Sequence, residues 1–155
     1  MAGQAVTLAG TRITPLSEQE VAATGFNVRY RLLYSDILYG TGATDTVTVT
    51  LGATPAKWYI DKAGLNITTI YAGITALTIT VGTTSSTAAM ISSTTLLTAA
   101  FLNQVSTVPV LTNCTATAAV NLVAVFTAAG TGGPAGLTAG QADLYLNVQD
   151  TARMP

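Results

Sequence analysis

The sequence predicts an all-β protein, a single domain built as a β-sandwich or jelly roll with a short N-terminal arm. The first reason is a series of short runs that alternate apolar and hydroxyl residues, as in Leu77-Thr78-Ile79-Thr80-Val81. A period of two is typical of half-buried strands and not of an amphipathic helix. The second reason is that turn-forming residues separate these runs at short intervals, as they do in sandwiches. The length of 155 residues fits one domain.

Charge is scarce in this chain. Only 8% of the residues are charged, against about 25% in typical soluble proteins, and residues 63 to 142 include no Asp, Glu, Lys or Arg. The formal net charge of -1 argues against nucleic acid and acidic membranes as partners. Hydroxyl and methyl surface is cheaper to dehydrate than charged surface, so the composition favours packing against copies of the chain or a large assembly.

Targeting signals are not predicted. Residues 1 to 7 lack a basic region followed by an apolar region, the pattern of a secretory signal. The most apolar run, residues 116 to 129, is shorter than the roughly twenty residues that a membrane helix needs. We therefore expect cytoplasmic synthesis and no membrane span. The single cysteine, Cys114, cannot form an intramolecular disulfide and is interpreted as a buried thiol.

The first 25 residues differ from the rest of the chain. Residues 4 to 13 could form one strand, and residues 15 to 23 predict a short helix or turn. Ser17 and Glu20 have the spacing of a capping box, and Gly25 ends the helix. We divide the chain into residues 1–25, an arm or a packed first element, and residues 26–155, the sandwich domain.

If residues 1–25 form an arm, they would bind a partner by strand-edge or arm pairing, which needs little side-chain charge. Deleting residues 2 to 23 would then leave a folded, oligomeric sandwich that no longer binds its partner. The candidate partner-binding residues are Arg12, Leu16, Glu18 and Glu20.

The sandwich domain begins with a predicted strand over residues 26–34. One face of this strand is apolar and aromatic, and the other carries Arg29 and Arg31. Two arginines on one face allow an anion site, although a solvated strand face is the simpler interpretation. Further strands are predicted at residues 46–51, 57–60, 65–71, 77–81, 88–91, 96–102, 108–111, 116–126 and 142–148. Residues 130 to 140 are predicted to form a long flexible loop.

Catalysis is not predicted. The chain has no histidine, which removes the common nucleophile pairs and most zinc sites. Asp36 and Asp45 flank a predicted turn and could approach as a calcium or glycosidase pair, but turn carboxylates that bind their own backbone explain them more simply. We therefore expect no enzyme, no cofactor and no metal.

Two segments resemble small head-associated proteins of tailed bacteriophages. Residues 70–83 contain a strand and turn, Leu-Thr-x-Thr-Val-Gly, and residues 137–148 contain Leu-Thr-Ala-Gly followed by alternating apolar positions. The resemblance implies a capsid decoration, or cement, protein: a β-sandwich or jelly-roll subunit that assembles as a trimer and binds the major capsid protein. It also implies a place on the outside of the virion after synthesis in the host cytoplasm.

A second function stays open beside the structural one. The chain could be a carbohydrate-binding or receptor-binding sandwich of a tail or cell surface, in which aromatic rings stack against sugars. Core packing explains the same aromatic residues, because most of them occupy alternating strand positions. The residues of this possible platform are Trp58, Tyr59, Tyr30 and Tyr34.

Overall fold

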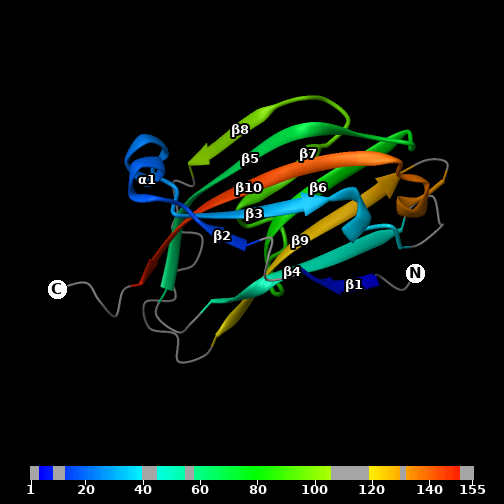
Figure 1. Ribbon diagram of the computed structural model, residues 1–155. Coiled ribbons are helices and arrows are strands. Elements are labelled where there is room, and N and C mark those ends of the chain that lie inside the picture. The colour runs from blue at the N-terminus through cyan, green and yellow to red at the C-terminus, as the bar shows by residue number, and fades with distance from the viewer. Residues whose placement is uncertain are drawn as a thin grey trace.

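The computed structural model confirms an all-β sandwich in which two five-stranded sheets pack face to face (Figure 1). It describes residues 4–8, 13–39, 45–54, 58–105, 119–129 and 132–150. The predicted strand at residues 108–111, together with Arg12 and Cys114, lies outside these residues.

Each sheet combines strands from distant parts of the chain. The first sheet has the order β1 (Gln4–Thr7), β4 (Thr46–Thr54), β9 (Val120–Ala129), β6 (Ala76–Thr83) and β7 (Ile91–Thr95). The second sheet has the order β2 (Ile13–Pro15), β3 (Val28–Leu33), β10 (Ala139–Asp150), β5 (Trp58–Ala72) and β8 (Phe101–Val105). The helix α1 (Glu18–Thr24) and two short 3₁₀ turns, η2 (Tyr34–Asp36) and η3 (Pro134–Gly136), connect strands.

The eight strands from β3 to β10 have the connectivity of a jelly roll. The first pairs with the last, β3 with β10, and the pairing continues inward through β4 with β9, β5 with β8 and β6 with β7. Two further ladders, β10 with β5 and β9 with β6, join these hairpins into sheets. All six ladders are antiparallel, so this part of the chain behaves as one long hairpin rolled into two sheets.

The core lies between the sheets and follows the predicted alternation. Leu77, Ile79 and Val81 of β6 are completely buried, and the intervening threonines point away from them. The Tyr71 ring packs against Phe126 with centroids 6.4 Å apart, and its hydroxyl donates a hydrogen bond of 3.0 Å to the Leu32 carbonyl. Burial raises the pKa of the Tyr71 phenol, which keeps this donor protonated.

Several strand boundaries differ from the prediction. The predicted break after residue 51 is absent because β4 passes through Gly52 in a β-bulge. The two strands predicted at 57–60 and 65–71 are one strand, β5, whose charged Asp61 and Lys62 interrupt the sequence pattern without interrupting the backbone ladder. The loop predicted at 130–140 contains η3, and Pro134 is buried there.

The described residues of the N-terminal segment pack within the domain. They form two strands, not one, and these strands belong to different sheets: β1 pairs in parallel with β4, and β2 pairs antiparallel with β3. Leu8 is buried in the core. The predicted helix is confirmed as α1, with Gly25 in the left-handed conformation at its end. Deleting residues 2 to 23 would therefore remove core contacts and one edge strand of each sheet, β1 and β2.

Candidate interaction surfaces

Charge is divided unequally between the two sheets. The strands of the first sheet contain no Asp, Glu, Lys or Arg. All charged strand residues belong to the second sheet, on β3, β5 and β10: Arg29, Arg31, Asp61, Lys62, Asp143 and Asp150. The two outer faces of the sandwich therefore differ in the cost of removing water from them.

The outer face of the first sheet is built from threonine. In β4, Val47, Val49 and Leu51 are buried, so the alternating threonines point outward. Strand pairing aligns these residues in rows across the sheet, where Val125 lies between Thr48 and Thr80. We call this surface the threonine face: Thr46, Thr48, Thr50, Thr78, Thr80, Val125 and Thr127.

One end of this sheet surface is already covered by the chain itself. Val123 lies beside Thr50 and Gly82 in the ladders but is only 1% exposed. The loop after β6 packs against this end of the sheet, because a Cβ on the neighbouring Gly82 would meet the Ser86 carbonyl oxygen. The residues of this loop, 84–87, are themselves uncharged.

The two arginines of β3 do not form an anion site together. Arg31 donates two hydrogen bonds to Asp143 on the adjacent strand, from Nε at 2.9 Å and from Nη2 at 3.1 Å. The Asp143 side chain is 4% exposed and the Arg31 side chain is 41% exposed. This bidentate pair raises the pKa of Arg31 and compensates the burial of the carboxylate.

We expect Arg31→Ala to lower the free energy of unfolding by about 2 kcal/mol, because it leaves the buried Asp143 carboxylate without its cation. The half-exposed guanidinium reduces this cost below that of a fully buried pair. The double variant Arg31→Ala/Asp143→Ala should unfold at higher denaturant concentration than Arg31→Ala alone. Equal or lower stability of the double variant would contradict a compensating role for the arginine.

The helix α1 has the predicted capping box. The Ser17 hydroxyl accepts a hydrogen bond from the Glu20 amide, and Glu20 Oε2 accepts hydrogen bonds from the Ser17 amide at 2.9 Å and the Ser17 hydroxyl at 2.8 Å. These bonds lower the pKa of Glu20, with the Ser17 amide as the main cause. Of the candidate arm residues, Glu18 and Glu20 are exposed and Leu16 is half-buried.

A pKa lowered by folding means that the Glu20 carboxylate stabilises the helix above the unfolded value of about 4.3. This contribution is lost as the pH falls through the lower, folded value. We therefore expect α1 amide signals in NMR spectra to shift toward coil values below about pH 4. Glu20→Gln keeps the cap without a titrating group, so it should remove this pH dependence, and an unchanged titration would contradict the assignment.

The described side chains do not form the predicted aromatic platform. Tyr30 is 8% exposed and belongs to the core, and Tyr34 packs against the core. Tyr59 is half-buried, and the Trp58 side chain lies outside the described part of the structure. Strand alternation explains this outcome, because Tyr30 and Tyr34 share the inward face of the chain around β3.

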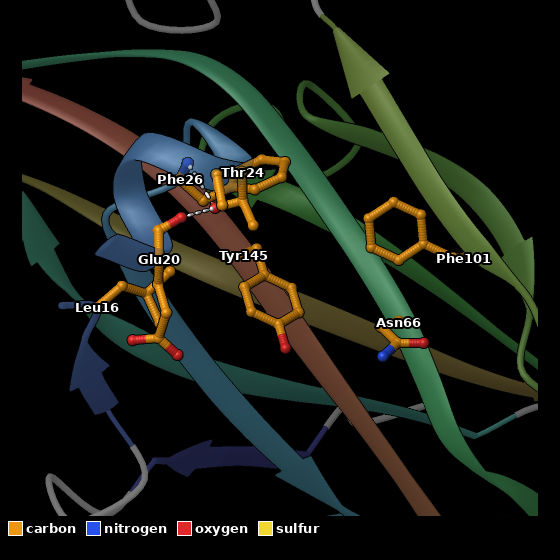
Figure 2. Close-up of a pocket in the computed structure, with 8 residues that line it drawn as sticks. Leu16, Glu20, Thr24, Phe26, Asn66, Phe101 and Tyr145 are labelled. Carbon is orange, nitrogen blue, oxygen red and sulfur yellow. Dashed lines mark hydrogen bonds between the residues drawn. The ribbon is translucent and has the colours of Figure 1, made fainter. Parts of the chain in front are cut away.

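A different aromatic groove lies on the outer face of the second sheet, and the sequence did not reveal it. Figure 2 shows Tyr145 between Glu20 on the left and Asn66 on the right, with Phe101 above Asn66. The groove has a volume of about 400 Å³ and is lined by Leu16, Glu20, Ala23, Thr24, Phe26, Asn66, Phe101 and Tyr145.

The two residues proposed as a metal or catalytic pair both take part in hydrogen bonds with the main chain, Asp36 through its carboxylate and Asp45 through its backbone carbonyl. Asp36 accepts a hydrogen bond of 2.8 Å from the Leu33 amide, and the Asp45 carbonyl accepts one from the Ala128 amide. Within the described residues, no group of three or more His, Cys, Asp or Glu side chains is placed to hold a metal ion.

No helix in the described ranges is long and apolar enough to cross a membrane. Comparisons of this chain with protein-family models, with curated proteins and with solved structures find no match.

Proposed function

We propose that this protein is a structural virion component that decorates and stabilises a bacteriophage shell by binding the major capsid protein. The observation that carries this proposal is the threonine face, which spans the three central strands of a sheet whose described strands contain no charged residue. Such a surface can lose its bound water against a partner without leaving a buried charge unpaired.

The jelly-roll connectivity is compatible with this role, because jelly rolls occur in viral capsid proteins and also in lectins. Fold alone does not assign a function, so the proposal depends on the surface. On this surface, threonine methyl groups supply apolar contact, and hydroxyl groups can donate or accept hydrogen bonds. No hydrogen bond within the described residues uses the hydroxyls of Thr48 or Thr80, which leaves them available to a partner.

We infer that part of the threonine face also meets a different patch of a sister subunit in a homotrimer, in which each protomer buries on the order of 800 Å². The N-terminal segment contributes less to partner binding than an extended arm would, because β1 and β2 already pair with strands of their own domain. The virion exterior is the proposed location.

The test is co-sedimentation of the protein with shells of a phage major capsid protein encoded beside its gene. Binding through apolar and hydroxyl contacts should change less than about threefold between about 0.1 M and about 1 M salt, because salt screens only charge attraction. Release of the protein at about 1 M salt, or no binding at either concentration, would contradict the proposal.

A further inference from the structure

The groove on the second sheet combines apolar rings with unused polar groups. The Phe26 and Tyr145 rings are tilted at 44° with centroids 5.9 Å apart, which fixes the orientation of Tyr145. Lys62 makes a cation–π contact with Phe26, with Nζ 5.2 Å from the ring centroid. The aromatic wall beside α1 is therefore built from residues that support one another.

The opposite wall is Phe101 on β8, which pairs with Asn66 on β5. Phe101 is 59% exposed, the largest exposed fraction among the large apolar side chains of the described residues. Gly64 lies opposite Tyr145 in the ladder and adds no side chain to the floor between the walls. An exposed ring beside an open floor offers a flat apolar surface to a ligand.

Three polar groups of the groove have hydrogen-bonding capacity left. Within the described residues, no hydrogen bond uses the Asn66 amide or the Tyr145 hydroxyl. Glu20 engages Ser17 through Oε2, which leaves Oε1 open. The amide can donate and accept, the phenol can do both, and the carboxylate accepts. An apolar ligand would leave these groups without partners, at a cost for each one that it buries.

We propose that this groove is a binding site for a neutral saccharide, with a pyranose ring lying between Phe101 and Tyr145. The C–H face of a sugar ring packs against aromatic carbon, and its hydroxyl groups match the donors and acceptors of Asn66, Tyr145 and Glu20. A few placed polar groups among apolar ones are typical of small-molecule sites.

The charge of the groove restricts the sugar class. Glu20 is the one charged residue among those that line it, while Lys62 approaches two lining residues, with Nζ 5.2 Å from the Phe26 ring centroid and 3.5 Å from the Thr24 carbonyl oxygen. The bonds from Ser17 lower its pKa, so the carboxylate stays ionised at neutral pH. A uronic or sialic acid would bring a second negative charge toward it, which disfavours binding.

This site is independent of the proposed shell contact, because the groove and the threonine face belong to different sheets. A decoration protein attached through the first sheet could hold a saccharide on the second. A variant that no longer binds the saccharide should therefore still co-sediment with shells.

The test is an NMR titration of the full chain with neutral trisaccharides of glucose, mannose and galactose, and in parallel with trigalacturonate. We expect at least one neutral sugar to shift the amide signals of Asn66 and Tyr145 with Kd of about 1 mM or below. The Kd for trigalacturonate should be at least about tenfold higher than the Kd for that neutral sugar. Glu20→Gln should reduce the ratio of the two Kd values, because it removes the negative charge.

Phe101→Ala should weaken the neutral sugar at least about tenfold. Because Phe101 is exposed, the melting temperature should change little. Ile70→Ala is the matched control: Ile70 is an exposed apolar residue of β5, 46% exposed, outside the groove, so its loss should not change binding. No shifts with any neutral sugar up to about 10 mM, binding of the acidic sugar alone, or equal binding by Phe101→Ala would each overturn the proposal.

Discussion

Replacing Gly140 with alanine is expected to lower the free energy of unfolding by about 3 kcal/mol or more, through backbone strain and overpacking. Gly140 has φ of 148°, and a Cβ there would overlap Cδ1 of the Tyr71 ring. The ring has no free space to move into, because Tyr71 is 1% exposed and its hydroxyl is bonded to the Leu32 carbonyl.

Gly52→Ala separates these two causes. Gly52 also has a positive φ, 140°, but a Cβ there would meet no atom within 4 Å. We expect it to cost only about 1 kcal/mol, the strain alone. Urea unfolding of both variants measures the difference, and equal losses would contradict a steric role for Tyr71.

The second large effect concerns assembly. The double substitution Thr48→Lys/Thr80→Lys places two ammonium groups beside Val125 in the middle of the threonine face. Burying these charges in an uncharged interface without partners is costly, so we expect association to weaken at least about 100-fold. Light scattering across a dilution series should then give a monomer where the unmodified protein gives an oligomer.

Thr69→Lys is the matched control for this double variant. Thr69 is an exposed threonine of β5 in the second sheet, so the same chemical change leaves the threonine face intact. Its oligomeric state should equal that of the unmodified protein, and both variants should keep a cooperative melting transition. Dissociation by Thr69→Lys, or a stable oligomer of the double variant, would argue against the threonine face as the interface.

The sequence predicts those parts of the fold in which local pattern and burial agree. Strand β6 was predicted at 77–81 and found at Ala76–Thr83, because its apolar and hydroxyl residues alternate strictly. Strand β7 was placed too early, at 88–91 instead of Ile91–Thr95. Its residues after Ile91 are all Ser or Thr, so no alternation marks them.

Long-range pairing limits what the sequence can say about surfaces. The sequence shows directly that residues 63–142 contain no charged residue. It does not show that uncharged strands lie together in one sheet, because this depends on β9 lying between β4 and β6. The groove likewise joins α1, β5, β8 and β10. Leu16 and Glu20 were selected as arm residues, and the structure places both in the groove wall, a role that no local pattern indicates.

A cryo-electron microscopy reconstruction of shells decorated with this protein tests the central claim most directly, because it shows which sheet is covered. We predict that the threonine face, including Thr48, Thr80 and Val125, is buried against the capsid protein or a sister subunit, and that the sheet with Arg31 and Asp143 faces outward. A reconstruction in which the charged sheet meets the shell while the threonine face lies open to solvent would contradict it.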